Sequence, residues 1–75
     1  MICEVGYDVG DGIYSVNMIE GNETLIKLAS KDHAKRYGYT VAYISKPLTE
    51  YEVAERRKRG MPIVDSFDSF FLEKD

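Results

Sequence analysis

The chain is short of the residues that build disulfides, metal sites and catalytic sets. It contains one cysteine, Cys3, and one histidine, His33, so no internal disulfide can form. A structural zinc site takes four nitrogen or sulfur ligands, which this pair cannot supply. No spacing connects the two residues as a nucleophile and its base. We therefore expect a non-catalytic protein with no cofactor and no metal.

Long apolar runs are also missing. No segment approaches the ~18 residues of a membrane span, and no charged-then-apolar leader opens the chain. With a free thiol, these features predict a cytoplasmic protein without a membrane partner. The 75 residues are 44% hydrophobic and 31% charged, which predicts one globular domain near the lower size limit for a self-sufficient core.

Basic residues are absent from the first 23 positions, which carry Glu4, Asp8, Asp11, Glu20 and Glu23. The "DVGDG" segment among these acids lacks the ligand series of a calcium loop and the Gly-Lys-Ser/Thr of a phosphate-binding loop. Acids beside a glycine turn are usually turn residues. We therefore expect no metal or nucleotide site in this segment.

The net charge of −3 argues against a surface given over wholly to nucleic acid. One basic cluster nevertheless follows the acids, and it consists of Arg56, Arg57, Lys58 and Arg59. These side chains have two interpretations. They can contact phosphates or an acidic partner, or they can simply stabilise a helix C-terminus. Lys31, Lys35 and Arg36 would extend the cluster if two helices lie side by side.

Alternating polar and apolar residues predict strands over 2–9 and 13–19, with a glycine turn between them. Cys3, Val5, Tyr7 and Val9 share the apolar face of the first strand. A third strand is expected over 24–30, which gives an antiparallel meander. The segment 39–45 is β-branched, aromatic and apolar on both faces, which predicts a central strand.

Two helices are expected. A short one follows Ser30 or Asp32 as its N-cap and ends at Gly38. A second begins at Thr49, which forms a capping box with Glu52, and ends before Gly60. The order β-β-β-α-β-α predicts a small α+β domain with an antiparallel sheet and both helices on one face.

All three phenylalanines fall in the acidic segment "DSFDSFFLEKD", residues 65–75. Phe67, Phe70 and Phe71 have the i, i+3, i+4 spacing of one helix face. We predict a domain over 1–64 and a separate acidic-aromatic segment over 65–75. The stripe either folds back on its own sheet, swaps onto a twin subunit, or docks in a groove of another protein.

The segment "SFDSF", Ser66 to Phe70, resembles the short motif by which proteins bind bacterial DNA sliding clamps. Phe67, Asp68 and Phe70 match that motif in type, while Ser66 and Ser69 depart from it. The related eukaryotic and archaeal clamp motif is similar to Val64, Phe67, Phe70 and Phe71, without its glutamine. The whole chain also resembles in type the small acidic proteins that phages use to inhibit host enzymes.

The resemblance implies a viral, phage-type inhibitor or modulator of a host enzyme or DNA replication component such as the sliding clamp. The partner would contact Asp65, Phe67, Asp68, Phe70 and Phe71. The alternatives are a nucleic-acid-binding module that uses the basic cluster and a homodimeric accessory subunit.

Overall fold

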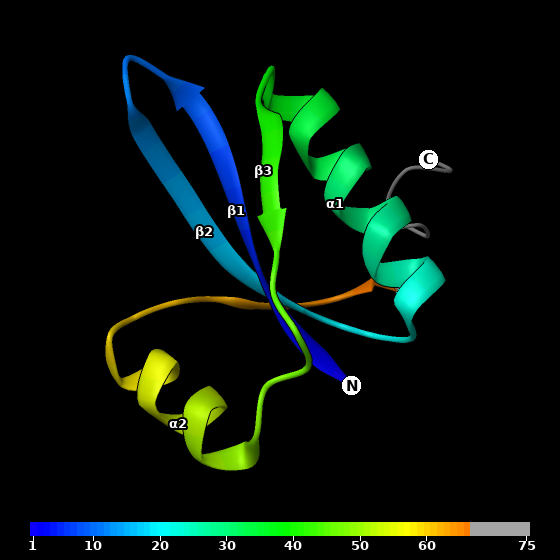
Figure 1. Cartoon of the computed structure of the whole chain (residues 1–75), viewed down its shortest axis with the longest axis vertical. Helices are drawn as coiled ribbons and strands as arrows, with labels where there is room; N and C mark the ends of the chain where they lie inside the picture. Colours follow the sequence, from blue (N-terminus) through cyan, green and yellow to red (C-terminus); the bar gives the residue numbers. More distant parts are fainter. Residues whose placement is uncertain (67–75) are drawn as a thin grey trace.

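The computed structural model describes residues 1–66 and confirms a small α+β fold with a four-stranded sheet and two helices (Figure 1). The strands are β1 (Ile2–Gly10), β2 (Ile13–Glu20), β3 (Thr40–Ile44) and β4 (Ile63–Asp65). The helices are α1 (Glu23–Tyr37) and α2 (Glu50–Lys58). The order along the described chain is therefore β-β-α-β-α-β.

The β1–β2 hairpin is the longest paired element, and it confirms the first two predicted strands. Its register runs from Ile2 opposite Glu20 to Gly10 opposite Ile13. Asp11 has a φ of 55° between Gly10 and Gly12, at 107° and 74°. Glycine tolerates such positive φ values, so the sequence Gly-Asp-Gly is suited to this turn. Figure 1 shows this turn at one end of the sheet, opposite the end where α2 lies.

The strand order is β3-β1-β2-β4. β3 pairs antiparallel to β1, whereas β4 pairs parallel to β2. The sheet is therefore mixed rather than wholly antiparallel, and β3 lies at an edge rather than at the centre. Although its residues are mostly apolar, β3 is not buried on both faces, because Tyr43 and Ile44 remain 41% and 37% exposed.

The predicted strand over 24–30 is wrong, because these residues form the first half of α1. Asn22 caps the helix by accepting a hydrogen bond from the Leu25 amide at 2.8 Å. Ile26, Ala29 and Ala34 are buried on one face, at spacings that a helix aligns and a strand does not. The predicted end is confirmed, since Gly38 takes the left-handed conformation with φ 73°.

α2 matches its predicted start. The Thr49 hydroxyl accepts from the Glu52 amide at 3.2 Å, and the Glu52 carboxylate accepts from the Thr49 amide at 3.0 Å. This is the reciprocal capping box that the sequence predicts. No residue of α2 is fully buried, and Arg56 connects the helix to Glu4 of β1.

The two helices pack against opposite faces of the sheet, so the prediction that they share a face is wrong. Cys3, Val5 and Tyr7 face the core with α1, together with Ile19, Ile26, Ala29 and Ala34. The alternate residue Glu4 points to the other face and contacts α2. Successive side chains of a strand point to opposite faces of the sheet, so β1 contacts α1 with one set of side chains and α2 with the other. Within residues 1–66, no helix is long and apolar enough to cross a membrane.

Candidate functional site

Most of the predicted partner-binding segment lies outside the described residues. Phe67, Asp68, Phe70 and Phe71 belong to this part of the chain. Asp65 is described, and it is an exposed residue of β4 opposite Glu20 of β2. Ser66 is only 1% exposed and packs against Gly21. The described domain therefore extends two residues beyond the boundary at residue 64.

The basic cluster is partly engaged within the molecule. Arg56 forms an ion pair with Glu4 at 2.5 Å, and Arg59 forms one with Glu55 at 2.8 Å. Arg57 and Lys58 are exposed at the end of α2. The bases of α1 lie across the sheet from α2, so they do not extend this cluster.

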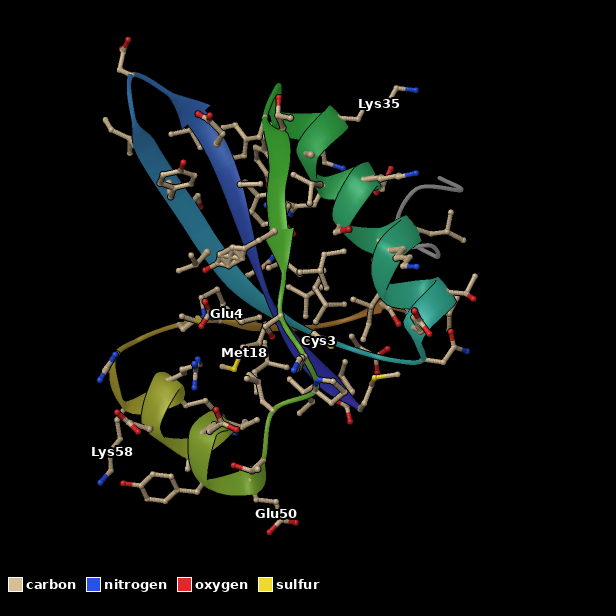
Figure 2. The ribbon with its side chains drawn as sticks, in the orientation of Figure 1. Cys3, Glu4, Met18, Lys35, Glu50 and Lys58 are labelled. Atoms are coloured by element: carbon tan, nitrogen blue, oxygen red, sulfur yellow. The ribbon has the colours of Figure 1, made fainter. Side chains whose placement is uncertain are left out.

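Glu4 connects three elements on the α2 side of the sheet (Figure 2). Its carboxylate accepts hydrogen bonds from the Tyr43 hydroxyl on β3 and from Nε of Arg56 on α2. The Tyr43 hydrogen bond, followed by the Arg56 contact, lowers the pKa of Glu4. The same contact raises the pKa of Tyr43 to about 12. Glu4 is thus a fixed anion that ties β1 to β3 and α2.

The Tyr43 ring lies across Gly6, the next residue of β1 on the same face. A Cβ atom built at Gly6 would meet the ring carbons at 2.5–2.9 Å. Sequence reasoning missed this contact, although a glycine inside a strand pattern often marks the close approach of another group. The glycine allows the tyrosine to lie flat while its hydroxyl reaches Glu4.

An open sheet face lies beyond α2, toward the β1–β2 turn. Among the described residues it is formed by Asp8, Tyr14, Val16 and Tyr43, which the strand register places on the side opposite α1, and Gly6 on the same side is covered by Tyr43. Figure 1 shows α2 at the far end of this face, away from the turn. Tyr14 is 60% exposed, and Asp8 lies directly opposite it across the hairpin. The carboxylate of Asp8 also accepts from the Gly10 amide at 2.9 Å, which fixes it beside the turn.

On the α1 side, the single histidine belongs to an aromatic cluster. The ring of His33 lies 4.7 Å from those of Tyr7 and Tyr37, centroid to centroid. Burial, followed by the nearby charge of Arg36, lowers the pKa of His33. The Tyr7 hydroxyl donates to Asn17 at 3.0 Å in the buried core. These contacts give His33 a packing role.

Cys3 lies near the start of α1, whereas His33 lies near its end. The thiol is 4% exposed, and burial raises its pKa, which disfavours the reactive thiolate. Among the residues that the structure describes, no group of three or more His, Cys, Asp or Glu side chains is placed to hold a metal ion. The open sheet face is therefore the clearest candidate for function in this part of the chain.

Comparison with known proteins adds no relative. No family model, no curated protein and no solved structure matches the chain.

Proposed function

We propose that this protein acts without catalysis, by binding another protein through its open sheet face. The observation that carries the proposal is the pairing of Tyr14 with Asp8 at the uncovered end of the hairpin. Tyrosine is enriched at protein interfaces because it offers a large apolar ring and a polar tip. Asp11 at the turn adds a second exposed carboxylate.

The chemistry of this face favours a partner with a basic surface and an apolar pocket. Basic side chains are absent from residues 1–23, so no neighbour in the hairpin sequence cancels the charge of Asp8 and Asp11. Such acids steer association with a basic surface, and the tyrosine ring then supplies buried contact area. The tyrosines are held on paired strands, so little conformational freedom is lost on binding.

The specific form of the proposal is a phage-type inhibitor or modulator of a larger host protein in the cytoplasm. A replication component such as the DNA sliding clamp is the first candidate, because it is the partner that the resemblance of Ser66 to Phe70 implies. Surfaces that hold nucleic acid are basic, which suits the acidic hairpin. In this form, the hairpin and the acidic-aromatic segment contact one partner together.

Nucleic-acid binding is the weaker alternative. Two of the four bases in the cluster are already paired with carboxylates, and the bases of α1 lie on the other side of the sheet. Phosphate binding would fall steeply with salt. A gel shift at low salt with single- and double-stranded DNA and RNA measures this alternative directly.

The test is affinity purification from bacterial lysate with matched variants. Tyr14→Ala removes the exposed ring of the open sheet face, and Tyr51→Ala removes a 76% exposed ring from α2 as the control. We expect a partner that full-length protein and Tyr51→Ala retain and that Tyr14→Ala loses. With that partner purified, Tyr14→Ala should weaken binding about tenfold or more.

A second experiment distinguishes binding by the open sheet face from binding by the acidic-aromatic segment. A chain that ends at residue 66 keeps β4 and buried Ser66, whereas a cut at 64 would remove Asp65 from its pairing. Weaker capture by residues 1–66 assigns part of the binding to 67–75. Equal capture by the wild type and Tyr14→Ala would remove the open sheet face as the binding surface.

A further inference from the structure

A cavity of about 360 Å³ lies on the α1 side of the molecule, away from the open sheet face. It forms where the start of β1, the start of α1 and the segment after β3 meet. Its lining includes the buried side chains of Cys3 and Ile26, with Ile44 and Pro47 from the segment around the end of β3. This volume is at the small end of the range for ligand sites, which are mostly apolar with a few polar groups.

Two lysines also line the cavity, Lys27 from α1 and Lys46 from the segment before α2. Among residues 1–66, the one carboxylate in the lining is that of Glu23, which lies 3.4 Å from the Lys27 ammonium. After that pair is counted, the Lys46 ammonium remains, and Met1 with its N-terminal ammonium also lines the cavity.

We propose that this cavity binds a small aliphatic carboxylate, with its hydrocarbon chain against Cys3 and Ile26 and its carboxylate near Lys46. Burial of the chain removes apolar surface from water, and the lysine ammonium favours an anion at the entrance. An aliphatic amine of the same length would place like charges together. An aliphatic alcohol would gain the apolar contacts alone.

Cys3 provides a reporter at the site, because it is the only cysteine of the chain and lines the cavity. The probes are octanoate, octanol and octylamine, each added to the full-length protein. Calorimetric titration measures their affinities, and the rate of iodoacetamide alkylation of Cys3 reports whether the cavity is occupied. We expect octanoate to bind most tightly and to slow alkylation. Each methylene added between butanoate and octanoate should tighten binding about fourfold until the cavity is full.

Matched variants locate the binding. Ile44→Trp places a large ring at the cavity and should abolish octanoate binding, whereas Leu28→Trp adds the same ring at an exposed position outside the lining. Lys46→Gln should weaken octanoate about threefold and leave octanol unchanged. Circular dichroism confirms that each variant is folded before it is compared.

Three results would overturn the proposal. Octylamine or octanol could bind as tightly as octanoate, which removes the role of charge. Saturating octanoate could leave Cys3 alkylation unchanged, which places any binding elsewhere. A synthetic peptide of residues 65–75 could protect Cys3 where octanoate does not, which would make the cavity a peptide-docking site instead.

Discussion

The ring of Tyr43 lies directly over Gly6, so closely that a Cβ atom at residue 6 would meet the ring at 2.5 Å. Gly6→Ala must therefore displace the ring and disturb its hydrogen bond to Glu4. Overpacking of this kind typically costs about 1–3 kcal/mol, and we expect that loss in the free energy of unfolding. Urea denaturation followed by circular dichroism measures it.

A double-mutant cycle tests the cause. In a Tyr43→Ala background the obstructing ring is gone, so Gly6→Ala should cost much less than in the wild type. An equal cost in both backgrounds would show that the effect arises in the β1 backbone instead of against Tyr43.

Because of Glu4, the free energy of unfolding should decrease as the pH falls into the acid range. The folded pKa of Glu4 lies below the ordinary glutamate value of 4.5 because Tyr43 and Arg56 donate hydrogen bonds to its carboxylate. Its stabilising contribution is therefore present above that value and is lost as the pH falls through the folded pKa. We expect Glu4→Gln to be less stable than the wild type at pH 7, with the difference shrinking below pH 4.5. Glu55→Gln, at an exposed ion pair with Arg59, is the control and should change little.

Removing only one partner of the buried hydrogen bond between Tyr7 and Asn17 should lower the free energy of unfolding. Asn17→Ala leaves the Tyr7 hydroxyl without its acceptor in the core, and an unsatisfied buried polar group costs about 1–3 kcal/mol. Thermal and urea unfolding of this variant give the measured loss. A Ser30→Ala variant is a useful comparison, because that hydroxyl bonds only within α1.

Ionisation of the buried Tyr7 hydroxyl should lower the stability of the protein at alkaline pH. Burial raises the folded pKa of Tyr7 to about 12 from the ordinary tyrosine value of 10.0. The neutral form is therefore favoured by folding, so this contribution is complete below pH 10 and disappears as the pH rises toward 12. We expect the stability of the wild type to fall over this interval more than that of Tyr7→Phe. Parallel curves for the two proteins would contradict the assignment.

Thr49→Ala should loosen α2 without unfolding the core. Loss of an N-cap costs about 1 kcal/mol, and no buried residue of α2 compensates for it. Hydrogen exchange should become about fivefold faster in the α2 amides and remain nearly unchanged in β1 and β2. Asn22→Ala at the start of α1 should instead lower global stability, because α1 packs on the core.

The features that sequence predicted well depend on local chemistry. The Gly10–Gly12 turn, the Thr49 capping box and the Gly38 stop each involve residues close together in the chain. The buried alternation of Cys3, Val5 and Tyr7 is equally local, since strand geometry alone defines it. These positions were predictable because no distant contact overrides the local preference.

The failures have the opposite cause. Residues 24–30 contain apolar positions that fit either period over so short a segment, although the buried residues Ile26, Ala29 and Ser30 have the i, i+3, i+4 spacing of a helix. β4 has three residues, too few for any periodicity, and only its pairing with β2 defines it. The placement of the helices on opposite faces follows from long-range contacts such as that of Arg56 with Glu4. The cavity and the open sheet face were unpredictable for the same reason.

The polar attachment of α2 also has a consequence for proteolysis. Arg56, Arg57 and Lys58 at its C-terminal end and Arg59 at its C-cap are all trypsin sites, and the helix buries no side chain completely. Local opening exposes such a segment to protease long before the whole chain unfolds. Trypsin should therefore nick the native protein in α2 first, and the β1–β2–α1 core should survive as a folded, clipped species.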